Sequence, residues 1–114
     1  MEYTTWNQIR YALWLDHDEV ESRVRSLQRA LSPKVARIRY HLGEDHTGEA
    51  SIFLKVTLSD QANKSGTTVK LGLLIRRLEA KITERLRLDR SGLYAYFNYR
   101  TVSEQLALKD KDWE

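Results

Sequence analysis

The sequence predicts one α+β domain of two layers, in which helices pack on one face of an antiparallel sheet of three strands. Segments that alternate apolar and polar residues are typical of half-buried strands, whereas apolar residues spaced three or four apart are typical of amphipathic helices. The resulting order is α-β-β-α-β-α. The 114 residues contain no internal repeat and no linker, so we expect a single domain over residues 1–114.

The strand predictions rest on alternation. The predicted strands are residues 35–42, 50–58 and 93–99. The first two flank GEDHTGE, a polar turn at residues 43–49, and therefore predict an antiparallel hairpin. In the first strand, the residues expected to face inward are Ala36, Ile38, Tyr40 and Leu42.

The helix predictions rest on apolar stripes and on capping patterns. The predicted helices are residues 19–31, 69–88 and 102–109. Asp18 with Glu21, and Thr101 with Glu104, have the spacing of capping boxes. Pro33 ends the first helix, because a residue before proline avoids the α region.

Residues 5–15 fit two structures. Trp6, Ile9 and Leu13 keep helical spacing, whereas Ile9, Tyr11 and Leu13 also alternate as in a strand. We favour a helix. A strand here would change the order to β-α-β-β-α-β, which is ferredoxin-like and adds a fourth strand.

Charge and cysteine content limit the function classes. The net charge is +3. The surplus of basic residues falls mainly on the helix predicted at 69–88, where these residues are expected to form a face exposed to solvent. The absence of cysteine excludes disulfides and thiolate chemistry. The N-terminus lacks a signal-peptide pattern and no apolar run is long enough to span a bilayer, so we expect a cytoplasmic protein with no membrane partner.

The outward face of the predicted sheet is the most distinctive candidate surface. Its expected residues combine aromatic rings with cations and are Arg37, Arg39, His41, Phe53, Lys55, Tyr94 and Tyr96. We expect this face to be covered by the N-terminal segment at residues 5–15 or by a second copy of the chain, and less often by another protein, since tyrosine buries area while its hydroxyl keeps a partner. The alternative is stacking of unpaired bases in single-stranded nucleic acid.

A second candidate lies at the junction after the third strand. Arg100 and Glu104 suit either an ion pair or recognition of a ligand carboxylate, but a capped strand-to-helix junction is the preferred explanation. The Asp16-His17-Asp18 and Glu44-Asp45-His46 clusters match no metal-ligand spacing. We therefore expect no metal, no cofactor and no catalytic residues.

Two stretches carry a resemblance to known proteins. GEDHTGEASIFLKVTLSD at residues 43–60 and YAYFNYRTVSEQ at 94–105 resemble a family of small bacterial proteins whose activity is uncharacterised. The order of elements is also similar to that of the cytoplasmic tail domain of cation-efflux transporters, without its ligand pattern. Neither resemblance implies an activity.

The sequence therefore predicts a non-enzymatic protein-interaction module. Two forms are expected: a homodimer, or one half of a two-gene bacterial system such as an antitoxin-like partner. A single-stranded nucleic-acid-binding domain is the alternative, and a small enzyme is the third hypothesis.

Overall fold

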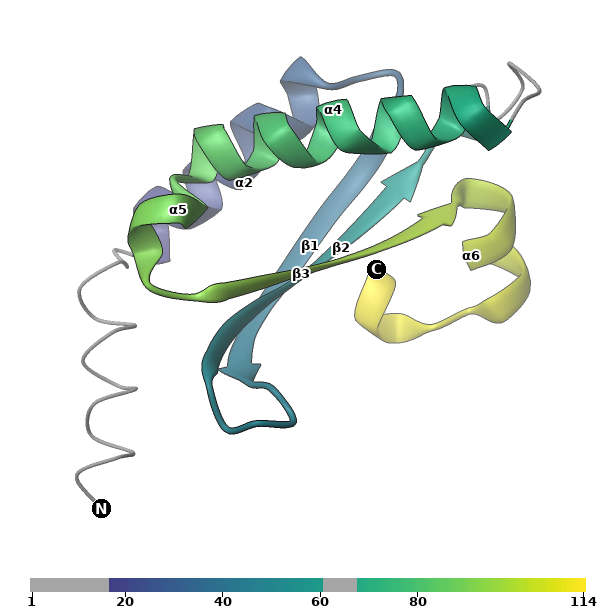
Figure 1. Ribbon diagram of the computed structural model, residues 1–114. Coiled ribbons are helices and arrows are strands. Elements are labelled where there is room, and N and C mark those ends of the chain that lie inside the picture. The colour runs from purple at the N-terminus through teal and green to yellow at the C-terminus, as the bar shows by residue number, and fades with distance from the viewer. Residues whose placement is uncertain (1–16, 61–67) are drawn as a thin grey trace.

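The computed structural model describes residues 17–60 and 68–114 (Figure 1). The predicted segment 5–15 lies outside these residues. In chain order the elements are α2 (His17–Ala30), β1 (Val35–Glu44), β2 (Ala50–Leu58), α4 (Thr68–Leu86), α5 (Leu88–Ser91), β3 (Tyr94–Thr101), α6 (Val102–Leu108) and the 3-10 helix η1 (Lys111–Trp113). The α+β class and the predicted order are confirmed.

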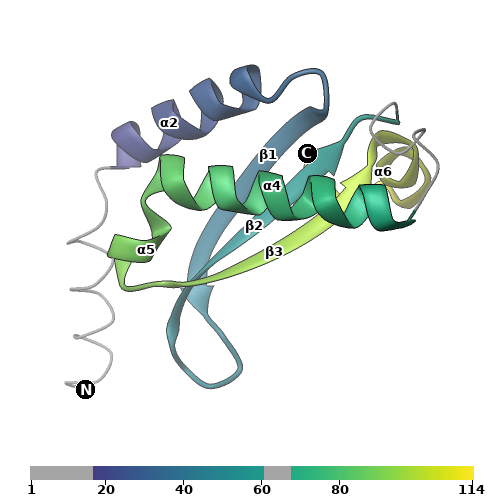
Figure 2. The ribbon, with the colours of Figure 1, turned by 45° about the horizontal axis from the view of Figure 1, so that its top comes forward.

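The sheet is mixed rather than wholly antiparallel. Its strands lie in the order β1-β2-β3, with β1 antiparallel and β3 parallel to β2. The antiparallel hairpin is confirmed, whereas the predicted antiparallel direction of the third strand is wrong. α4 carries the chain back along the sheet between β2 and β3, and a helical crossover of this kind joins parallel strands (Figure 2).

The ferredoxin-like alternative does not describe this sheet. That fold places its first strand between the strands equivalent to β2 and β3. Here β2 and β3 pair directly, from Ser51 opposite Tyr94 to Leu58 opposite Thr101. No position remains between them for another strand.

The core lies between the sheet and the two long helices, which cover the same face (Figures 1 and 2). Every second side chain of β2 points into it, because alternation along a central strand presents one set of residues to each face. The buried residues of this core include Ile52, Leu54 and Val56 from β2, Val24 and Leu27 from α2, and Leu78, Ile82 and Leu86 from α4.

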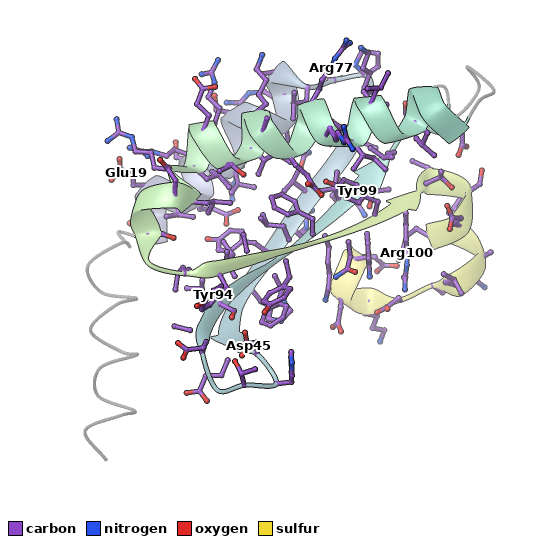
Figure 3. The ribbon with its side chains drawn as sticks, viewed as in Figure 1. Glu19, Asp45, Arg77, Tyr94, Tyr99 and Arg100 are labelled. Carbon is purple, nitrogen blue, oxygen red and sulfur yellow. The ribbon has the colours of Figure 1, made fainter. Side chains whose placement is uncertain are left out.

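A tyrosine fixes α4 against β3. The Tyr99 hydroxyl donates to Oε1 of Glu79 on α4 at 2.9 Å, and the side chain points from β3 toward that helix (Figure 3). Burial raises the pKa of Tyr99 well above its ordinary value, and the nearby Glu79 carboxylate raises it further. The phenol is therefore a neutral donor that joins the two layers.

Some predicted boundaries and faces differ from the structure. Ala36 is exposed and Val35 buried instead, because the pairing register shifts between Val35 and Arg37 and so displaces the alternation. α2 begins at His17, which places Asp18 in its first turn rather than at its N-cap. α4 ends at Leu86, and the next residue, Arg87, has a left-handed φ of 53°.

The last helices also depart from the expected one-sided arrangement. α6 and η1 lie on the opposite side of the sheet from α2 and α4 (Figure 1). We call the sheet surface on that side the outer face, and residues 102–114 the C-terminal segment. The outer face is therefore partly covered by the chain itself.

Truncating Leu54 tests the position of the core. Leu54→Ala should lower the free energy of unfolding by about 2–5 kcal/mol, because Leu54 is fully buried and its removal leaves a cavity. Leu108→Ala is the matched control, since Leu108 is 59% exposed and should change stability by less than about 0.5 kcal/mol. Equal losses in urea unfolding would contradict this arrangement.

Candidate functional site

The C-terminal segment docks on the outer face through a buried tryptophan. Trp113 is only 5% exposed, and the guanidinium carbon of Arg100 lies 4.4 Å from the centre of its ring. Nη1 of Arg100 also donates to Oε1 of Gln105 at 3.1 Å and to Oδ2 of Asp110 at 3.4 Å. One β3 side chain thus holds both α6 and the turn that follows it by stacking and hydrogen bonds.

Two of the predicted surface cations interact with this segment. Nε of Arg39 donates to the main-chain oxygen of Glu114 at 2.8 Å. Nζ of Lys55 lies 3.9 Å from Oδ2 of Asp112, and the Lys55 side chain is only 16% exposed. Both residues lie on the outer face as predicted. The C-terminal segment covers Lys55 and accepts a hydrogen bond from the Arg39 guanidinium.

The other half of the outer face carries a row of three stacked rings. His41 pairs with Phe53 across β1 and β2, and Phe53 pairs with Tyr96 across β2 and β3. The His41 and Phe53 ring centres are 4.8 Å apart with 13° between planes, and those of Phe53 and Tyr96 are 5.4 Å apart with 16°. We call these three residues the aromatic row.

The spacing within the aromatic row fixes how its rings stand on the sheet. Coplanar rings lying flat at these separations would overlap sterically, so near-parallel rings this close must be stacked, directly or with an offset. The rings therefore stand steeply on the strands. They turn their faces toward one another and present their edges to the surface.

The aromatic row remains partly uncovered. Tyr96 is 36% exposed, and the neighbouring Tyr94 is 54% exposed. His41 is also exposed, whereas Phe53 between the two outer rings is half-buried. This half of the face offers apolar ring edges and hydroxyl groups, which suits contact with another protein surface.

Asp45 ties the hairpin turn to the aromatic row. Its Oδ1 accepts hydrogen bonds from Thr47 N at 2.9 Å, Thr47 Oγ1 at 2.6 Å and Glu49 N at 3.0 Å. Its Oδ2 accepts from the Tyr96 hydroxyl at 2.7 Å. Figure 3 shows Asp45 and Tyr94 at the same end of the sheet. These hydrogen bonds, led by that of the Thr47 hydroxyl, hold the pKa of Asp45 far below its usual range.

The second predicted pair is not brought together. Glu104 accepts a hydrogen bond from Thr101 N at 3.2 Å, and Thr101 Oγ1 accepts one from Glu104 N at 3.1 Å. This is the predicted capping box at the start of α6. Arg100 (Figure 3) interacts instead with Gln105, Asp110 and Trp113.

The residues that the structure describes contain no cluster of side chains that could hold a metal ion. Among residues 17–60 and 68–114, no group of three or more His, Asp and Glu side chains is close enough to hold an ion. Asp16 lies outside these ranges. Asp45 is occupied by the hydrogen bonds of its own turn.

Of the helices that the structure describes, none is long and apolar enough to cross a membrane.

Sequence reasoning missed two features of the site. No role was predicted for Trp113, although a large aromatic ring among charged residues indicates a side chain that packs against another part of the chain. The Asp45–Tyr96 hydrogen bond joins residues 51 positions apart. No local pattern reveals such a contact.

The Asp45 interactions predict a pH dependence of stability. Because its pKa is depressed in the folded protein, the Asp45 contribution is present above the ordinary value of 3.8 and lost as the pH falls through the lower, folded value. The unfolding free energies of the wild type and of Asp45→Asn should therefore differ at neutral pH and converge in acid. An unchanged difference across this range would contradict the assignment.

The same hydrogen bond predicts a change at Tyr96. Asp45 raises the pKa of Tyr96 above 10.0, so Asp45→Asn should lower it, as followed by phenolate absorbance. The stabilisation from this bond is present below 10.0 and lost as the pH rises through the folded value. Thr47→Ala is a useful companion variant, because it should raise the pKa of Asp45 without removing the carboxylate.

Comparison with known proteins leaves the chain without an assigned relative: no protein-family model, no curated protein and no solved structure matches it. The resemblance inferred from residues 43–60 and 94–105 stays a prediction. The candidate site therefore rests on the chain's own geometry.

Proposed function

We propose that this chain is a non-enzymatic protein-interaction module that self-associates through the uncovered half of its outer face. The observation that supports this is the aromatic row, which the C-terminal segment leaves open while it covers Lys55 in the adjacent half. An exposed group of aromatic side chains on a small domain is typical of a contact surface.

The orientation of the rings favours a protein surface as the occupant. Rings that stand on edge form a ridge with phenol and imidazole polar groups, which a second apolar surface can bury with little loss of side-chain freedom. Asp45 restrains Tyr96 through its hydroxyl, and Phe53 is held between two rings. A preorganised surface of this kind loses less entropy on binding.

A second copy of the chain is the simplest partner. Most homo-oligomers close by two-fold symmetry, in which the same patch lies on both sides of the interface. The aromatic row presents apolar edges and polar groups of both hydrogen-bonding types, so it is compatible with itself. β3 is also an edge strand of the described sheet, and unpaired edges favour association.

Binding of single-stranded nucleic acid is supported less well. Bases stack on the faces of aromatic rings, but in the aromatic row Phe53 already has a ring on each side, which leaves only the outer faces of His41 and Tyr96 for stacking. Arg39 and Lys55, which were expected to contact phosphates, interact with the C-terminal segment instead. Tyr94 is exposed, and it is the ring to which we assign base stacking in this alternative.

Self-association is expected to depend on the aromatic row. Light scattering at micromolar concentration should give twice the chain mass of 13.4 kDa. Phe53→Ser combined with Tyr96→Ser should give a folded monomer, because it removes two of the three rings. A wild-type chain that stays monomeric at high concentration would contradict the proposal.

The control is a pair of exposed leucines elsewhere. Leu73 and Leu108 are 47% and 59% exposed and lie on α4 and α6, away from the aromatic row. Their joint replacement by serine should leave the dimer intact. Equal dissociation by both double variants would show that the effect is not specific to this surface.

The alternative has its own measurement. If a base stacks on Tyr94, single-stranded RNA or DNA should bind at low salt, and Tyr94→Ala should cost roughly 1–3 kcal/mol of binding free energy. Affinity should then fall steeply with added salt. We expect no such binding, and a salt-dependent complex weakened by this variant would replace the proposed function.

A further inference from the structure

A cavity lies between the outer face and the C-terminal segment, away from the aromatic row. Its volume is about 350 Å³, at the lower end of the range for small-molecule sites. Its walls come from β1, β2, α6 and the residues that follow α6. They are Ala36, Arg37, Thr57, Val102, Gln105, Leu106, Lys109 and Glu114.

The strongest sign of a ligand is a hydroxyl group without a partner. Thr57 is 4% exposed, and its Oγ1 is the one buried side-chain polar atom of the described residues that lacks a hydrogen bond. Ser51 on the same strand is buried too, but its hydroxyl donates to the main-chain oxygen of Glu49 at 2.9 Å. A buried hydroxyl left unbonded is costly, and the Thr57 side chain borders the cavity.

The walls of the cavity are apolar in part and open to solvent. Val102 and Leu106 line it from α6, and Ala36 lines it from β1. Leu106 is 70% exposed, the largest exposed fraction among the described large hydrophobic side chains. An apolar portion of a ligand would bury this leucine against the sheet.

The charged groups at the cavity favour an anion. Arg37 lies opposite Thr57 in the strand pairing, and Lys109 ends α6. Neither side chain forms a salt bridge with another residue of ranges 17–60 and 68–114. Glu114 contributes the opposing carboxylate, and its main-chain oxygen is held by Arg39. The nearby Asp110 and Asp112 carboxylates face Arg100 and Lys55.

We propose that this cavity binds a small amphipathic carboxylate. Its apolar chain lies against Val102 and Leu106, and its carboxylate lies near Arg37 and Lys109. The Thr57 hydroxyl, whose oxygen is fully buried, rotates about the Cα–Cβ bond to donate a hydrogen bond to this carboxylate. Charge-assisted hydrogen bonds of this kind are stronger than neutral ones, which accounts for the choice of a carboxylate over an alcohol. This site is separate from the aromatic row and does not depend on self-association.

Octanoate and 1-octanol are matched probes, because they share an apolar chain and differ in the head group. NMR titration of the full chain should show saturable shifts at the amides of residues 57, 102 and 106 with octanoate. Octanol should bind at least about tenfold more weakly. Added salt should weaken the octanoate complex, since part of the attraction is between charges.

Variants assign the individual contacts. Arg37→Gln and Lys109→Gln should each weaken octanoate binding several-fold, and Glu114→Gln should strengthen it. Thr57→Val should stabilise the free protein or leave its stability unchanged, because it removes an unpaired buried hydroxyl, yet it should weaken octanoate binding. A purely structural role for Thr57 would not produce these opposite effects.

Two leucines on α6 provide the steric control. Leu106→Trp should block the cavity and abolish binding, whereas Leu108→Trp should not, because Leu108 is also exposed but does not line the cavity. Phe53→Ser with Tyr96→Ser should bind octanoate normally even if it is monomeric. No saturable binding in the millimolar range, equal affinity for octanol, or equal effects of the two tryptophan variants would overturn the proposal.

Discussion

β2 is the central strand of the sheet, and its side chains alternate between the two faces. The rest of the structure depends on how far each face is covered. α2 and α4 bury the inner set completely. The outer set is covered only in part, by a C-terminal segment that Arg100 holds through the Trp113 ring. The incomplete cover leaves the aromatic row on one side and a cavity beneath α6 on the other.

Local periodicity was enough to predict the three strands and the helices α2, α4 and α6, but not the short helices α5 and η1. Alternation along residues 50–58 gave β2 with its observed bounds, and the Thr101–Glu104 spacing gave the cap of α6. The direction of β3 was mistaken, because it depends on the path of α4 rather than on any pattern within β3. The exposure of Ala36 depends on a register shift, which a strict alternation of period two does not contain.

The candidate site was only partly visible in the sequence. Strand alternation placed His41, Phe53 and Tyr96 on one face, but their stacking depends on pairing across three strands. The hydrogen-bond partner of the Arg39 guanidinium is a residue 75 positions away. Contacts of this kind are set by the tertiary fold, so residue spacing predicted which side chains share a face but not which of them remain accessible.

The docking of Trp113 under Arg100 is the contact that divides the outer face, and NMR tests it directly. The ring should shift the δ protons of Arg100 upfield in the wild type, and Trp113→Ala should return them to ordinary values. Nuclear Overhauser effects should also connect the indole ring to the Arg100 side chain. Arg100 shifts that are the same in both proteins, with no such effects, would contradict this account of the outer face.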